Sequence, residues 1–185
     1  MTRHAPELSR WTAAMSVPGC IDRDTFLDIA AAAREHCGSM KPFAIFLIHV
    51  DPPSRRFGRL DEATGEHLDH LAALRVKHAV GDNVMLRLGA RRFLVLVPGP
   101  IDEFSAVALS GRLHEALRAR FDVGEGDTFV TTSIGVGLGE RYEDAAVVLE
   151  QSERALERVK TNGGDATVVE STRQMFQRAK RNSAA

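Results

Sequence analysis

The sequence predicts an α/β fold: a split βαβ sandwich, ferredoxin-like or palm-type, in which helices flank a mixed, mainly antiparallel central sheet. Apolar runs of strand length alternate with segments of helical periodicity, in the order helix, strand, helix, hairpin, helix, strand, helix, strand. The 185 residues are 44% hydrophobic and 26% charged, which suits the core of one globular domain.

The first elements predicted are a helix and a buried strand. Residues 22–36 place apolar side chains at helical spacing, with Asp22 or Asp24 as the N-cap and Gly38 after the last turn. Residues 42–50 (PFAIFLIHV) are a continuous apolar run that is too short to span a membrane as a helix. Such a run predicts a central strand that is covered on both faces.

Two amphipathic helices and a hairpin are predicted in the middle of the chain. The helices cover residues 61–80 and 101–121, and the hairpin between them turns at Gly89. The apolar side chains that mark the first helix are Leu68, Leu71, Leu74 and Val76. In the second helix, the apolar side chains expected to face inward are Phe104, Val107, Ala108, Leu113 and Leu117.

The last third predicts a strand, a helix and a short final strand. Residues 128–138 are rich in β-branched side chains, which favours a strand. Residues 143–164 have amphipathic helical spacing and end at the Asn-Gly pair 162–163, which is typical of a helix C-terminus. Residues 166–170 (ATVVE) predict the last strand.

The charge balance excludes several functions. A formal net charge of -1 and an isoelectric point near 6.7 argue against a general binder of nucleic acids or membrane surfaces, which needs one sign of charge over a whole face. No apolar run reaches the roughly 18 residues of a membrane helix, and the polar start lacks a signal-peptide core. Cys20 and Cys37 lie too far apart for a CxxC motif. We therefore expect a cytoplasmic protein without membrane insertion.

Five segments, in the same order and at similar spacing, resemble the bacterial diguanylate cyclase domains of the GGDEF family. The segment GCIDRDTF is similar to GLPNRRAF of that family, AIFLIHVD to ALLLLDLD, and RLGARRFLVLVP to RLGGDEFxVLLP. Further on, VTTSIGVGL is similar to VTVSIGVAL and ALERVKTNGGDATVV to ALYRAKAAGRNRVVV. The resemblance implies a domain at residues 19–170, preceded by an extension at 1–18 that is expected to be helical and followed by a basic tail at 171–185.

The family joins two GTP molecules into cyclic di-GMP with the help of Mg²⁺, which needs hard carboxylate ligands. The resemblance places these two carboxylates at the fourth letter of GGDEF and at the first Asp of the strand motif DLD. Arg92 and His49 stand at these positions, so both metal ligands are expected to be lost. The degenerate signature as a whole is Gly89, Ala90, Arg91, Arg92 and Phe93.

Other positions that the family uses have also changed. The Asn and Asp that read guanine fall near Asp61 and near Asp69 or His70. Lys160 keeps one of the two basic positions that grip the phosphates, whereas Gly164 replaces the Arg of the other. The inhibitory motif RxxD becomes VGDN at residues 80–83, which lacks the planar arginine fork.

The resemblance therefore implies a domain that is not an enzyme and holds no metal or cofactor. The leading hypothesis is a regulatory or scaffolding module in bacterial signalling that contacts an unidentified protein or a second copy of itself. The alternative is a metal-independent receptor for GTP or a related guanine nucleotide, and an active cyclase with a rearranged metal site is least favoured.

Two groups of residues carry these hypotheses. Arg91, Arg92 and Lys160 would form a phosphate clamp, because guanidinium binds phosphate oxygens in a bidentate manner; the other reading is a set of solvated charges. In the N-terminal extension, Leu8, Trp11 and Met15 share one helical stripe, which suits either packing on the domain or docking to a partner.

Overall fold

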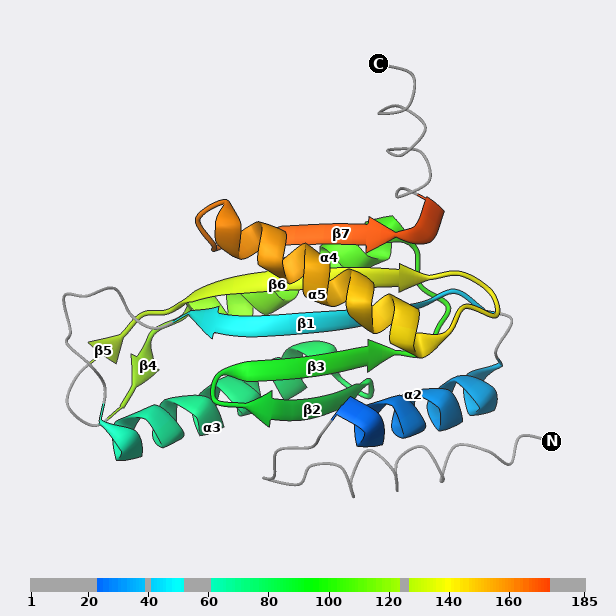
Figure 1. The fold of residues 1–185 in the computed structure, drawn as a ribbon. Helices are drawn as coiled ribbons and strands as arrows, with labels where there is room; N and C mark the ends of the chain where they lie inside the picture. Colours follow the sequence, from blue (N-terminus) through cyan, green and yellow to red (C-terminus); the bar gives the residue numbers. More distant parts are fainter. Residues whose placement is uncertain (1–22, 39–40, 52–60, 124–126, 174–185) are drawn as a thin grey trace, which may run out of the picture.

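A five-stranded sheet with the strand order β2-β3-β1-β6-β7 is the centre of the molecule (Figure 1). The structure is a computed structural model, and it describes residues 23–38, 41–51, 61–123 and 127–173. Neighbouring strands pair antiparallel except for β6 and β7, which are parallel. The predicted mixed, mainly antiparallel sheet is therefore confirmed. Its strands are β1 (Phe43–Asp51), β2 (Val84–Gly89), β3 (Arg92–Val97), β6 (Thr131–Gly139) and β7 (Thr167–Ser171).

In the described part of the chain, helices cover both faces of the sheet (Figure 1). They are α2 (Arg23–Cys37), α3 (Glu62–Val80), α4 (Glu103–Arg118) and α5 (Ala145–Thr161). Strand β1 alternates between two buried clusters: Ile45 and Leu47 pack with residues of α2 and α5, whereas Phe46 and Ile48 pack with residues of α3 and α4. The central strand is thus buried on both faces, as its apolar run predicted.

Helix α5 lies very close to strand β6 because that strand has glycines under the helix. A Cβ added to Gly135 would lie 2.1 Å from the carbonyl oxygen of Ser152 and 2.3 Å from the backbone nitrogen of Leu156. At Gly137 the same atom would lie 2.1 Å from the carbonyl oxygen of Val148. The alternating glycines of SIGVG therefore set the distance between the sheet and the helix that ends at the candidate site.

The inward face of α4 was predicted correctly at Leu113 and Leu117, which are buried, but wrongly at the other three positions. Phe104 and Val107 are 82% and 52% exposed, and Ala108 is also exposed. Two faces of this helix carry apolar residues at helical spacing, so periodicity alone does not choose between them. The face that contains the larger pair Leu113 and Leu117 packs on the sheet, and the other face lies in solvent.

Two smaller expectations are corrected as well. Leu74, which fits the apolar pattern of α3, is 55% exposed, because the buried face of the helix runs through Leu68, Ala72 and Val76. Asp24 lies inside the first turn of α2 and does not precede it as an N-cap. The C-cap of α5 at Asn162 agrees with the prediction.

Some elements were not predicted or are not described. A small two-stranded sheet of β4 (Phe121–Asp122) and β5 (Asp127–Thr128) was missed. The docking stripe of Leu8, Trp11 and Met15 lies outside the described residues, as do Asp22 and most of the basic tail. Within the part of the chain that the structure describes, no helix is long and apolar enough to cross a membrane.

Candidate functional site

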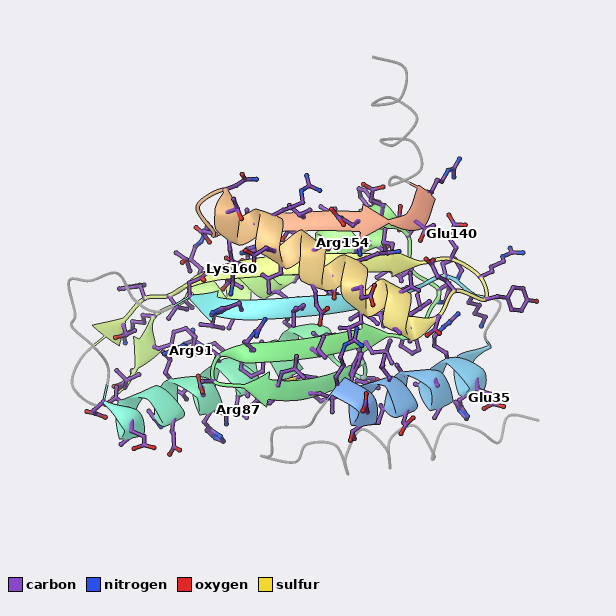
Figure 2. All side chains as sticks on the ribbon, viewed as in Figure 1. Glu35, Arg87, Arg91, Glu140, Arg154 and Lys160 are labelled. Atoms are coloured by element: carbon purple, nitrogen blue, oxygen red, sulfur yellow. The ribbon has the colours of Figure 1, made fainter. Side chains whose placement is uncertain are left out.

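Three elements end together at one end of the sheet: strand β1, the turn between β2 and β3, and helix α5 (Figure 1). Figure 2 shows Arg91 in the hairpin turn and Lys160 on the last turn of α5, both at this end of the molecule. His49 and Asp51 lie in the last three residues of β1. The topology therefore collects residues from three separate parts of the sequence, and we call this region the His49 end of the sheet.

The hairpin turn is held in a fixed place beside β1. Ala90 and Arg91 form the turn, Gly89 pairs with Arg92, and Arg91 adopts a positive φ of 57°. The backbone N–H of Val50 donates to the carbonyl oxygen of Arg91 at 2.9 Å, which ties the turn to the end of β1. Arg91 is half-buried and Arg92 is exposed, so the tip of the hairpin carries two guanidinium groups.

His49 is the central residue of this region. In the sheet register it lies opposite Arg92 on β3 and opposite Ser133 on β6. Residues directly opposite each other in a ladder project to the same face, so the three side chains share the face that α5 covers. Asp51 is two residues further along the same strand, and its carboxylate accepts a hydrogen bond from the Ser133 hydroxyl at 2.7 Å.

The charges around His49 keep its imidazole neutral. Burial, together with the positive charges of Lys160, Arg92 and Arg91, lowers the pKa of His49 to about 4, against the opposing effect of Asp51. The Nδ1 atom is buried and has no hydrogen-bond partner among the described residues. At neutral pH the ring is therefore an uncharged group surrounded by cations.

The residues at this end do not suit Mg²⁺. Asp51 is a carboxylate there, but it is held by Ser133, and the neighbouring side chains of His49 and Arg92 supply no hard oxygen ligand. In the described ranges, no group of three or more His, Cys, Asp or Glu side chains is arranged to hold a metal ion. A divalent cation would also face the positive charges of Arg91, Arg92 and Lys160.

The two carboxylates that were candidates for reading guanine have structural partners. Asp61 is the N-cap of α3 and accepts from the backbone N–H of Thr64 at 2.7 Å. Asp69 is buried and forms an ion pair with Arg87 at 2.7 Å, which joins α3 to strand β2 near the hairpin turn. His70 is exposed on α3. The local contacts give each of these acids a role in holding the fold.

The segment at 80–83 is closed by its own hydrogen bonds. The Asn83 side-chain amide donates to the carbonyl oxygen of Val80 at 2.8 Å, and the Lys77 ammonium donates to the carbonyl oxygen of Gly81 at 2.9 Å. Val80 is buried in the core between α3 and the sheet. The residue at the arginine position of RxxD is thus a core side chain.

Sequence reasoning missed two residues of the site. Ser133 and Asp51 were quoted within motifs, but no role was given to either. Gly164 fits closely beside them, since a Cβ there would lie 3.3 Å from the Ser133 hydroxyl oxygen and 3.7 Å from Asp51 Oδ2. A polar Ser in the apolar run SIGV was the available signal, because a fully buried strand position rarely holds a hydroxyl without a partner.

Comparison with known protein families identifies the family to which this chain belongs. Residues 21–166 match the family described as diguanylate cyclase, GGDEF domain. This match covers most of the chain, which therefore belongs to the GGDEF family, a family of cyclic di-GMP signalling.

Individual proteins are similar to this chain in sequence or in fold. An uncharacterised protein of Mycobacterium tuberculosis is 27% identical over 134 residues, and the chain spans 22% of the length of that relative. Diguanylate cyclase SiaD of Pseudomonas aeruginosa, solved in complex with its activator SiaC, has a TM-score of 0.74 at 20% identity over 88% of this chain and 64% of that one. The GGDEF domain of YfiN from the same species has a TM-score of 0.71 at 20% identity over 83% of this chain and 98% of that one. The two structures establish the fold.

Proposed function

We propose that this chain is a catalytically silent GGDEF domain, which acts as a regulatory or scaffolding module in bacterial signalling through contacts with other proteins. The observation that carries the proposal is the charge of the His49 end of the sheet. Compared with the family signature, Arg91 replaces an Asp, Arg92 a Glu and His49 another Asp. Together these replacements make the net charge of this region more positive by about five elementary charges. Phosphoryl transfer needs the opposite, a bound metal that neutralises phosphate charge.

The intact core supports a role that depends on the fold alone. Buried apolar residues form a core on both faces of the sheet, and a fold can persist without its chemistry. The relative SiaD is a protein with this fold that binds a protein activator. A surface for protein contacts is therefore compatible with the architecture.

The test of this function is GTP turnover. The purified protein, incubated with GTP and Mg²⁺ or Mn²⁺, is expected to form no cyclic di-GMP above a control without protein. The triple variant Ala90→Gly, Arg91→Asp, Arg92→Glu should stay inactive, because His49 still occupies the position of the second carboxylate. Turnover by the unaltered protein would overturn the proposal.

The second candidate function is binding of a guanine nucleotide without a metal. The arrangement of Arg91, Arg92 and Lys160 around His49 favours it. Arg92 lies opposite His49 in the sheet register, and the backbone of Arg91 is hydrogen-bonded to the next strand residue, Val50. The positive charge of Lys160 also acts on the His49 imidazole. Charge-assisted hydrogen bonds from such groups hold phosphate oxygens well. The partners of Asp61 and Asp69 count against base reading, which leaves the phosphates as the recognised part.

A further inference from the structure

Charged side chains of the hairpin, of α5 and of β1 itself surround His49. Arg92 lies across the ladder on β3, Arg91 in the turn, and Lys160 on α5, whereas Asp51 follows on β1. Strand β6 contributes Ser133, whose hydroxyl is uncharged and donates to Asp51. Among the described residues, the imidazole therefore has three cations and one carboxylate in its surroundings.

In the free protein these surroundings disfavour a proton on His49. An imidazolium would be repelled by the three cations, and the one nearby carboxylate is already engaged by Ser133. The buried Nδ1 atom also lacks an acceptor for an N–H among the described residues. A buried N–H without an acceptor is costly, which further disfavours the protonated ring.

A bound dianion would change this balance. Its negative charge would offset the cations, and one of its oxygens would accept a hydrogen bond from the part of the imidazole that remains exposed, since Nδ1 itself is buried. We propose that the His49 end of the sheet is a proton-linked anion site, which binds a phosphate-type dianion and takes up one proton from solvent on His49 in the same step. This inference rests on the second proposed function and states how that site is regulated.

Linkage fixes the sign of the effect. If the anion-bound protein holds one proton more than the free protein, the affinity for the anion rises as pH falls. The change approaches about tenfold per pH unit between the pKa values of the free and the bound states. The site would then bind the anion more tightly in a more acidic compartment and release it in a more basic one.

Sulfate is the appropriate probe, because it has the tetrahedral oxygens of a phosphate group. It also keeps its double negative charge over the pH range in which imidazole titrates. A phosphate monoester does not, since it titrates itself at about pH 6. The experiment follows the His49 ring signal by NMR from about pH 3.5 to 7.5, a range that includes the pKa of about 4 in the free protein, in sulfate and in chloride of matched ionic strength. The variant His49→Asn assigns the signal by its disappearance. The exposed residues His67, His70 and His78 report general salt effects in the same spectra.

The expected result is a rise of at least one unit in the pKa of His49 in sulfate, with tighter sulfate binding at pH 5 than at pH 7. In His49→Asn, sulfate binding followed by backbone signals at Arg91 and Gly164 should lose this pH dependence. Sulfate binding that leaves the titration of His49 unchanged overturns the proton linkage while the receptor function stands. An absence of sulfate binding overturns both.

Discussion

The substitution Gly135→Ala is expected to destabilise the domain by about 3 kcal/mol or more. The added methyl group would lie 2.1 Å from the carbonyl oxygen of Ser152 and 2.3 Å from the backbone nitrogen of Leu156. Both contacts are with the backbone of α5, which cannot yield as a flexible side chain can. The helix would have to move away from the sheet and expose the apolar residues that it buries.

Equilibrium urea denaturation monitored by circular dichroism measures this loss, and Gly111→Ala is the matched control. Gly111 lies in the exposed part of α4, with no atom within 4 Å of an added Cβ. Since alanine is the better helix former, Gly111→Ala should stabilise the domain by about 0.5–1 kcal/mol. An unchanged denaturation midpoint for Gly135→Ala would contradict the close packing of α5 on β6.

Arg87→Ala is expected to lower stability by about 3 kcal/mol, because it leaves a buried carboxylate without its charge partner. Asp69 is only 3% exposed and pairs with Arg87 at 2.7 Å, and the Arg87 side chain is 28% exposed. One oxygen of Asp69 already has no hydrogen-bond partner among the described residues, so the loss of Arg87 leaves the group fully unsatisfied. Strand β2 would loosen from α3 near the hairpin turn.

Two further variants test whether the loss of stability comes from the buried ion pair. The double variant Asp69→Leu, Arg87→Leu should recover much of the stability, since replacing a buried pair by apolar residues is often neutral. Arg118→Ala removes the guanidinium of an exposed pair with Asp165, 3.7 Å apart, and should cost no more than about 0.5 kcal/mol. Equal effects of Arg87→Ala and Arg118→Ala in urea denaturation would refute a structural role for the buried pair.

The sequence predicted an element correctly where its hydrophobic pattern fits only one position in the fold. A nine-residue apolar strand can only lie in the middle of a covered sheet, so β1 was predicted correctly. Helix α4 has two apolar faces, and tertiary packing, which local periodicity does not contain, decides that Phe104 is exposed and Leu113 is buried.

The candidate site was only partly predictable for a similar reason. The resemblance to GGDEF domains brought His49, Arg92 and Lys160 to attention, but the register that sets His49 between Arg92 and Ser133 joins strands far apart in the chain. The hydrogen bond from Ser133 to Asp51 depends on that register. Likewise, the ion pair that engages Asp69 depends on the packing of α3 against β2, which no local spacing specifies.

Divalent-cation binding at the His49 end of the sheet distinguishes a silent domain from a metal-dependent cyclase. Paramagnetic broadening of NMR signals by Mn²⁺, with and without GTP, measures it at individual residues. The signals of His49, Arg91 and Ser133 are expected to broaden no more than those of exposed residues elsewhere on the domain. Selective broadening at these three residues that disappears in Asp51→Asn would show a bound metal and contradict the proposed loss of the catalytic centre.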